Sequence, residues 1–260
     1  MSAVDIVVPL YNQRVFETPV IECFKDRDDV QFYVCDNSTD PEIKEQNRLV
    51  TNSQQRITYI DMGGNKGIAI AYNTAIKRCK GDIICIFDDD TTPGNNYVDL
   101  LKEHVVSEAI YMPIVKNGDR VLSPLNMKGP LIYPVQDISK IDLSSCSAFN
   151  TGMAFPRSVV SRCKHNEKLF IEFIDHDFCR QAHRIGMAFR MIPDAVLEQD
   201  YSVATNSLEA ALHRDRLGRI DVREYYSGSN TDRIYGHLYL AYRAVRNTLR
   251  YKTLAFLLQN

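Results

Sequence analysis

Residues Ile83–Phe87 read Ile-Ile-Cys-Ile-Phe and run directly into Asp88-Asp89-Asp90, after which Thr91-Thr92-Pro93-Gly94 opens a loop. The apolar run predicts a buried strand. In an open α/β sheet, ligands bind at the carboxyl ends of the strands. Alternate carboxylates such as Asp88 and Asp90 point the same way and can share a hard divalent cation. A solvated acidic turn is the alternative, but the buried strand leading into the triplet favours a metal-dependent nucleotide site.

Short apolar runs alternate with helical or polar segments through the first hundred residues. They lie at Val4–Val8, Gln31–Cys35, Ile57–Ile60 and Ile83–Phe87. This alternation predicts βαβ units and an α/β fold with a mostly parallel, Rossmann-like central sheet flanked by helices. We expect a nucleotide-binding and catalytic domain over residues 1–204 and a basic helical extension over residues 205–260.

The formal net charge of −2 hides an asymmetry along the chain. From residue 205 onward, nine Lys and Arg stand against five Asp and Glu, a charge of about +4, so the preceding part carries about −6. The seven cysteines form no CxxC pair, which indicates reduced thiols in a cytoplasmic protein. No signal peptide precedes the first strand, and no apolar run approaches the ~20 residues of a membrane span. We therefore expect a soluble cytoplasmic protein.

The last thirty residues predict a long amphipathic helix. Its apolar stripe consists of Ile234, Leu238, Ala241, Val245 and Leu249. The opposite face carries Arg243, Arg246 and Arg250. We expect the apolar stripe to dock on the body and the basic face to lie in water. The alternative is contact of the basic face with anionic lipid headgroups or a lipid-linked acceptor at the inner face of the cell membrane.

Four short motifs occur in order near the predicted strands. They are Val7-Val8-Pro9-Leu10-Tyr11-Asn12, Cys35-Asp36-Asn37-Ser38-Thr39-Asp40, Gly63-Gly64-Asn65-Lys66-Gly67 and Asp88-Asp89-Asp90. In this order and spacing the chain resembles the family-2 glycosyltransferases of the GT-A fold over most of residues 1–204. The resemblance implies a nucleotide-sugar donor and an acidic metal site. The chain also matches the family's N-x-G-x-x-x-A-x-N segment, at Asn65, Gly67, Ala71 and Asn73.

The nucleoside is expected between the first two strands. Asp36 ends an apolar strand and can accept a hydrogen bond from a pyrimidine N–H, while Pro9, Tyr11 and Asn12 can wall the base and sugar. The alternatives are that Asp36 caps an Asx turn and that Tyr11 belongs to the core; Asp40 is expected to be a turn or helix cap. UDP or dTDP fits such a pocket best.

The glycines of the third motif permit close backbone approach to a ligand, and Asn65 precedes a helix whose amino end is electropositive. A G-x-G-x-x-G fingerprint is absent, which disfavours a Rossmann dehydrogenase. The family resemblance puts the last aspartate, Asp90, on the metal, and Asp88 or Asp89 on the ribose or a metal-bound water. Mg²⁺ or Mn²⁺ would bridge the diphosphate and stabilise the leaving nucleotide.

A second acidic region, Leu169–Arg180, resembles the rhamnosyltransferase-like and galactofuranosyltransferase-like branch of the family. That resemblance implies that Asp175 is the general base that deprotonates an acceptor hydroxyl, with inversion at the anomeric carbon. The alternative is that Asp175 caps the following helix, although Asp177 is the more plausible cap. His176 is not expected to be a ligand.

The same resemblance assigns the donor and acceptor sugars to Asn150-Thr151-Gly152, with Glu172 nearby. Asn150 stands where the family usually has serine. The family's histidine that completes the metal shell is absent. Gln199, Asp200 and His213 remain open as a third ligand, or the acidic triplet and the diphosphate hold the metal alone.

These observations together predict an inverting, metal-dependent glycosyltransferase. It would move a sugar, with rhamnose or galactofuranose favoured by resemblance, from a UDP- or dTDP-sugar to a hydroxyl of a glycan or lipid-linked glycan in bacterial surface polysaccharide synthesis. A sugar nucleotidyltransferase and a non-catalytic nucleotide-sugar-binding subunit are the alternatives. No nucleic acid is expected as a partner.

Overall fold

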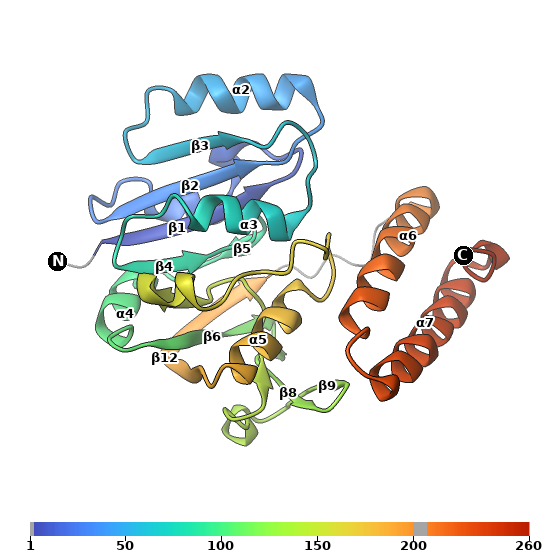
Figure 1. Cartoon of the computed structure of the whole chain (residues 1–260). Coiled ribbons are helices and arrows are strands. Elements are labelled where there is room, and N and C mark those ends of the chain that lie inside the picture. The colour runs from blue at the N-terminus through green and yellow to red at the C-terminus, as the bar shows by residue number, and fades with distance from the viewer. Residues whose placement is uncertain (1–2, 200–206, 260) are drawn as a thin grey trace.

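The computed structural model describes residues 3–199 and 207–259 (Figure 1). Its large sheet has the strand order β3-β2-β1-β4-β11-β6-β12-β5, and β7 pairs with β6. These strands are β1 (Val4–Leu10), β2 (Val30–Asp36), β3 (Ile57–Asp61), β4 (Ile83–Ile86), β5 (Thr91–Thr92), β6 (Ala109–Asn117), β7 (Arg120–Ser123), β11 (Ala154–Pro156) and β12 (Ala188–Gln199). A small sheet contains β8 (Leu125–Lys128), β9 (Leu131–Pro134) and β10 (Cys146–Ser147).

The first four long strands pair in parallel, as the alternating pattern predicts. Beyond β4 the short strand β11 runs antiparallel and joins this parallel block to β6, which pairs in parallel with β12. The α/β fold with a central sheet flanked by helices is therefore confirmed, with a mixed second half.

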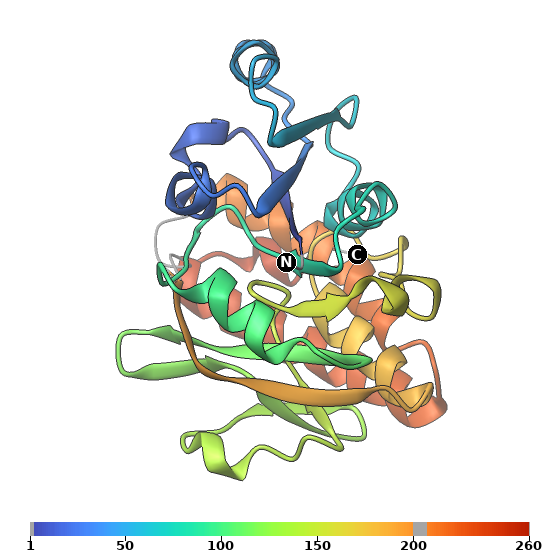
Figure 2. The ribbon, with the colours of Figure 1, turned by 90° about the vertical axis from the view of Figure 1, so that its left-hand side faces the viewer.

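Helices cover both faces of the sheet (Figures 1 and 2). The α-helices are α1 (Pro19–Phe24), α2 (Pro41–Thr51), α3 (Ile68–Ile76), α4 (Tyr97–His104), α5 (Ile174–Arg184), α6 (Leu208–Tyr225) and α7 (Asn230–Tyr251). Short 3₁₀ helices lie at η1 (Val15–Glu17), η2 (Ile138–Lys140), η3 (Arg157–Ser161) and η4 (Leu254–Phe256). One buried cluster packs α3, α5 and α6 on the sheet, and another packs α1 and α4 on the opposite face.

Alternate residues of β1 divide between these two clusters. Val7 lies in the first cluster, whereas Ile6 and Val8 lie in the second. This is the period of two that a strand buried on both faces requires. Val222 and Leu240, from α6 and α7, extend the first cluster, so the carboxyl-terminal helices share a core with the sheet. A domain boundary at residue 204/205 stays a prediction.

The orientation predicted for the last long helix, α7, is wrong. Ile234 and Leu238 are each 63% exposed and Leu249 is 72% exposed, while Arg243 is buried. The buried face instead combines Arg243 with Gly236, Leu240, Ala244 and Asn247. Carboxylates from other elements pair with Arg243, so a charged face can lie inside. No helix of the described residues is long and apolar enough to cross a membrane.

Candidate active site

The acidic triplet lies at the carboxyl end of β4, where the strand order places it beside β1 and β11. The Tyr72 hydroxyl donates to Asp88 Oδ1 over 2.7 Å, and the Asp88 N–H donates to Thr151 Oγ1 over 3.2 Å. Burial raises the pKa of Asp88 to about 7, and the negative charges of Asp90, Asp89 and Asp175 add to this effect. The hydrogen bond from Tyr72 opposes the shift. Asp175 therefore lies close enough to act electrostatically on Asp88.

Asp89 connects the triplet to the end of β1. Burial raises the pKa of Asp89 to about 6, the charge of Asp90 adds to the rise, and a hydrogen bond from the Tyr11 backbone N–H partly offsets it. Each raised pKa reports negative charge that water solvates poorly. A bound cation would relieve that cost, and carboxylate oxygens are the donors that Mg²⁺ and Mn²⁺ prefer.

Asp90 contacts the end of β12. Its Oδ1 accepts a hydrogen bond from Gln199 Nε2 over 3.1 Å and from Thr91 Oγ1 over 3.3 Å. The pairing of Gln199 with Thr91 between β12 and β5 produces this contact. Gln199 Oε1 is buried and has no hydrogen-bond partner in the part of the chain that the structure describes. An unpaired buried oxygen beside a carboxylate fits a hard cation.

The other two third-ligand candidates lie elsewhere. Asp200 is outside the described residues, and His213 is exposed on α6. Within residues 3–199 and 207–259, no group of three or more His, Cys, Asp or Glu side chains is arranged to hold a metal ion. Of the three candidates, Gln199 is the one that the structure places against the acidic triplet.

Asp175 occupies the first turn of α5, which starts after Phe173 in a left-handed conformation with φ 62°. Asp175 Oδ1 accepts a hydrogen bond from the backbone N–H of His176 over 2.8 Å. The His176 ring is held by Ser147, whose Oγ lies 2.7 Å from Nδ1. No side chain caps α5 at Phe173, and Asp177 bonds the side chain of Gln181. The prediction that Asp177 caps this helix is therefore wrong.

The loop that leads into α5 is held by Asp221 of α6. Asp221 accepts hydrogen bonds over 2.8 Å from the backbone N–H groups of Phe170, Ile171 and Glu172. Asp221 is fully buried, so these three donors solvate its charge in place of water. The helical extension thus fixes the loop that positions Asp175.

Glu172 points into the helical extension. Both of its carboxylate oxygens pair with the guanidinium of Arg243 on α7, with 3.1 Å between Nη2 and Oε1. A Cβ at Gly218 would lie 2.6 Å from Glu172 Oε2, so this glycine permits the close approach. Arg243 Nε also donates to Asp215 over 2.7 Å. The predicted sugar contact of Glu172 is not tested by this geometry, but it would require Glu172 to leave Arg243.

Sequence reasoning missed this polar network. Asp215 and Arg219 are spaced as an i, i+4 ion pair on α6, which was the available local signal. Asn247 Nδ2 also donates to Asp215, over 3.0 Å. Glu172 and Arg243, which form an ion pair, are 71 positions apart, and nothing in the local sequence links them.

In the predicted nucleoside pocket, Asp36 is fully buried. Its Oδ1 accepts from the Ser38 N–H over 2.8 Å, and its Oδ2 accepts from Asn47 Nδ2 and the Tyr59 hydroxyl, each over 2.9 Å. The bond to Ser38 forms the Asx turn that is the alternative to a contact between Asp36 and a base. Oδ1 accepts one of these three hydrogen bonds and can accept another, and a direct contact with a base stays a prediction.

The end of β1 adjoins this turn because Pro9 pairs with Cys35 and Leu10 with Asp36. Asn12, with φ 52°, accepts hydrogen bonds through Oδ1 from the N–H groups of Thr39 and Asp40. Asp40 caps α2, as predicted. Tyr11 is 51% exposed, which excludes the alternative that it belongs to the core.

Residues of the glycine motif lie where the start of α3 packs against the loop of residues 170–172. Gly67 has φ 90°, and a Cβ there would lie 2.9 Å from the Phe170 ring. The Ile68 N–H donates to the Phe170 carbonyl over 2.9 Å. Asn65 Oδ1 accepts from the Gly67 N–H over 3.1 Å, and Asn73 donates to the His165 carbonyl over 2.9 Å.

The Asn150-Thr151-Gly152 turn is buried beside β4. Thr151 accepts the N–H of Asp88, and Asn150 Oδ1 lies 3.3 Å from His165 Nε2. Gly152 has φ 73°, and a Cβ there would lie 2.3 Å from a Leu197 methyl group. The turn therefore helps to position the acidic triplet, through the hydrogen bond between Thr151 and the Asp88 backbone.

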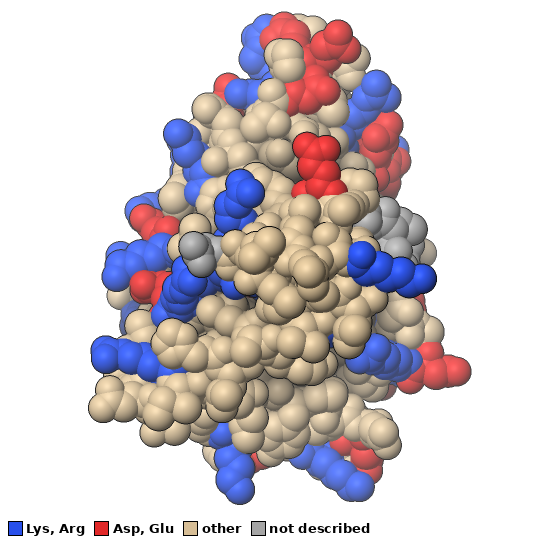
Figure 3. All heavy atoms as spheres, turned by 90° about the vertical axis from the view of Figure 1, so that its right-hand side faces the viewer, with Lys and Arg blue, Asp and Glu red and all other residues tan. Residues whose placement is uncertain are grey.

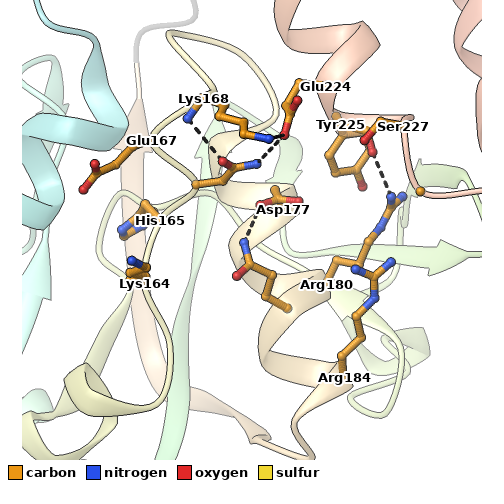
Figure 4. Close-up of a pocket in the computed structure, with 13 residues that line it drawn as sticks. Lys164, His165, Glu167, Lys168, Asp177, Arg180, Arg184, Glu224, Tyr225 and Ser227 are labelled. Atoms are coloured by element: carbon orange, nitrogen blue, oxygen red, sulfur yellow. Dashed lines mark hydrogen bonds and ion pairs between the residues drawn. The ribbon is translucent and has the colours of Figure 1, made fainter.

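A cavity of about 560 Å³ lies on the other face of α5 (Figure 4). It is lined in part by Asp177, Arg180 and Tyr225, and the Arg180 guanidinium lies 4.0 Å from the centre of the Tyr225 ring. Successive residues of an α-helix are about 100° apart, so Asp175 and Asp177 point in nearly opposite directions. This cavity is therefore separated by α5 from the group of Asp88, Asp90 and Asp175.

The family model described as "Glycosyl transferase family 2" matches residues 5–163. The chain belongs to this family, and its fold is that of the GT-A glycosyltransferases. No curated protein matches the chain.

Solved structures share the fold at low sequence identity. TarS 1–349 of S. aureus has a TM-score of 0.52 at 15% identity, covering 88% of this chain and 73% of its own. The mannosyltransferase PcManGT from Pyrobaculum calidifontis, in complex with GDP-Man and Mn²⁺, has a TM-score of 0.57 at 16% identity, covering 94% of this chain and 75% of its own. GalNAc-T7 with UDP, GalNAc and Mn²⁺ has a TM-score of 0.60 at 9% identity, covering 89% of this chain and 53% of its own.

Proposed function

We propose that this protein is an inverting, metal-dependent glycosyltransferase that uses a UDP- or dTDP-sugar and a glycan hydroxyl as acceptor. The observation that carries the proposal is the grouping of Asp89, Asp90 and Asp175 around Asp88, whose pKa their charges help to raise, at the carboxyl end of β4. A metal site and a general base are the two functions that such a transfer requires from the protein.

The metal would be Mn²⁺ or Mg²⁺, held by Asp88 and Asp90. The raised pKa of Asp88 and the unpaired Oε1 of Gln199 support a cation at this place. The ion, when bound, offsets the negative charge that develops on the leaving nucleoside diphosphate. PcManGT and GalNAc-T7, which share the fold, were crystallised with Mn²⁺.

Asp175 is the proposed general base. Its side chain is 21% exposed, so an acceptor can approach it. The His176 N–H donates to its Oδ1, and Asp221 holds the loop that precedes it. The acceptor hydroxyl gives its proton to Asp175 as its oxygen forms a bond to the anomeric carbon. The bond from that carbon to the phosphate oxygen breaks, and the nucleoside diphosphate leaves with the electron pair. Attack from the opposite side inverts the configuration.

The nucleoside of the donor is proposed to lie between the ends of β1 and β2, with its diphosphate toward the acidic triplet at the end of β4. Pro9, Tyr11 and Asn12 lie at the first strand end, and the Tyr11 N–H meets Asp89 of the triplet. Asn65, Gly67 and Asn73 support the adjoining loop, and Asp36, whose Oδ1 holds the Asx turn, is proposed to accept a hydrogen bond from the base N–H. Asn150, Thr151 and Gly152 are the proposed contacts of the sugars, together with Glu172 if it leaves Arg243.

The donor sugar and product rest on resemblance to the rhamnosyltransferase-like and galactofuranosyltransferase-like branch. Rhamnose or galactofuranose is the proposed sugar, and bacterial surface polysaccharide made in the cytoplasm, at the inner face of the membrane, is the proposed product.

Calorimetric titration with UDP and dTDP, each with Mn²⁺ and with EDTA, tests the donor and metal assignments. We expect Mn²⁺-dependent binding of at least one nucleotide. Asp90→Ala should weaken that binding by about tenfold or more because it removes a charged metal ligand. Asp99→Ala is the matched control, since Asp99 is an exposed acid on α4. Metal-independent binding in the unchanged protein would contradict the metal assignment.

A further inference from the structure

The outward face of α7 and the segment after it is apolar. We name it the α7 apolar face, and its large side chains are each 50–79% exposed. They are Ile234, Leu238, Tyr242, Val245, Leu249, Leu254, Leu257 and Leu258. The five on α7 follow one another at intervals of three or four residues, so they form one continuous stripe along the helix. A contiguous apolar surface of this kind marks a contact site.

The helix cannot turn this stripe inward. Its opposite face is fixed by the ion pairs of Arg243 with Glu172 and Asp215, and by Asn247 on Asp215. Gly236 packs against Tyr226 so closely that a Cβ would lie 2.8 Å from the Tyr226 Cβ. Rolling α7 would break buried charged hydrogen bonds, so the apolar face stays outside in the folded chain.

The charge around this face is mainly positive (Figure 3). From Arg233 to the last residue the sequence contains no Asp or Glu and five Lys and Arg. Of these basic residues Arg243 is buried, and the other four, Arg233, Arg246, Arg250 and Lys252, are exposed. Figure 3 shows this side of the molecule as a broad area without charge, bordered mainly by Lys and Arg.

We propose that the α7 apolar face docks on an anionic lipid surface, with α7 lying in the plane of the membrane. The stripe would enter the boundary between headgroups and acyl chains while the flanking arginines bind headgroup phosphates. Tyr242 suits this depth because its ring is apolar and its hydroxyl is polar. A second copy of the chain fits less well, since a two-fold contact through this face brings the same basic residues together.

Vesicle flotation of the full chain tests the proposal without any measurement of sugar transfer. The vesicles are phosphatidylcholine alone, or phosphatidylcholine and phosphatidylglycerol in equal parts. The protein should float with the mixed vesicles and much less with the neutral ones. The double substitution Leu238→Glu and Leu249→Glu should lower its partition by about tenfold or more. The matched control is Val106→Glu, because Val106 is 78% exposed after α4 and away from α7.

The double substitution Arg233→Gln and Arg246→Gln distinguishes the contribution of the basic side chains to vesicle binding from that of the apolar stripe. It should lower partition to the anionic vesicles and leave the weak partition to the neutral ones unchanged. Thermal unfolding of each variant confirms that it is folded.

Three outcomes would overturn the proposal. The unchanged protein could fail to float with either vesicle, or the double Leu variant could float as the unchanged protein does. Sedimentation could also show a dimer that the double Leu variant dissociates, with no vesicle binding. That last result would assign the face to a second copy of the chain.

Discussion

The guanidinium of Arg243 binds both carboxylate oxygens of Glu172, and this joins α7 to the loop just ahead of Asp175. Arg243 also binds Asp215, so one cation lies between two carboxylates. The carboxylates raise the pKa of Arg243 and burial opposes them, so its charge is kept. The helical extension is therefore bonded directly to the proposed catalytic loop.

Removing that cation should destabilise the fold. Arg243→Ala takes the guanidinium from Glu172, which is partly buried, and from Asp215, which keeps Arg219 and Asn247. We expect a loss of about 3 kcal/mol in the free energy of unfolding. Urea denaturation followed by circular dichroism measures it. Arg246→Ala is the matched control, since Arg246 is exposed on the same helix and should change stability by less than about 0.5 kcal/mol. Equal effects of the two substitutions would contradict the network's role.

Asp175→Asn should remove transfer while leaving the donor site intact. It takes away the proton acceptor without changing size, so we expect turnover to fall by about 100-fold or more. The affinity for UDP or dTDP with Mn²⁺, measured by calorimetry, should change by less than about twofold. The matched control is Asp177→Asn, two positions along α5 and on its other face. Unchanged turnover of Asp175→Asn would exclude this residue as the base.

The first half of the sheet could be predicted from the sequence because its signals are local. Apolar runs of strand length, broken by Gly and Pro, give β1 to β4. The placement of Asp88–Asp90 follows from the same runs, since a carboxylate after a strand in a parallel sheet must lie at the ligand-binding edge.

The orientation of α7 could not be predicted in this way. Helical periodicity identifies two faces but does not say which is buried, and hydrophobicity favoured the wrong one. The burial of Arg243 depends on Glu172 and Asp215, which lie 71 and 28 positions away. The burial of the Asp36 carboxylate likewise depends on Asn47 and Tyr59, donors that belong to the next helix and strand.

Asp221→Asn should uncouple the catalytic loop from the helical extension. An amide has one oxygen where the carboxylate has two, and its NH₂ group would face backbone N–H donors. We expect turnover to fall by about tenfold, with little change in nucleotide affinity, because Asp221 positions the loop and contacts none of the residues proposed to bind the nucleotide. Asp232→Asn, in the first turn of α7, is the control. A loss of nucleotide binding equal to the loss of turnover would show general unfolding of the site instead.

His165 should make the protein sensitive to acid. The side chain is fully buried between the rings of Phe178 and Tyr72, and burial lowers the pKa of His165 to about 3. In the unfolded chain the imidazole has a pKa near 6.5, so between about pH 3 and pH 6.5 the unfolded state binds the proton and the folded state does not. Stability from this group is thus present above pH 6.5 and is lost as the pH falls. At pH 4.5 the loss amounts to about 2–3 kcal/mol.

His165→Gln, which does not titrate, should remove this part of the pH dependence. We expect the variant to be less stable than the unchanged protein at pH 8 because it loses the ring stacking, and the difference to shrink by about 2–3 kcal/mol at pH 4.5. Urea denaturation across this pH range measures both curves. His213→Gln, at an exposed position on α6, should leave the pH dependence unchanged. Parallel curves for the protein and its His165→Gln variant would mean that His165 takes up its proton without unfolding.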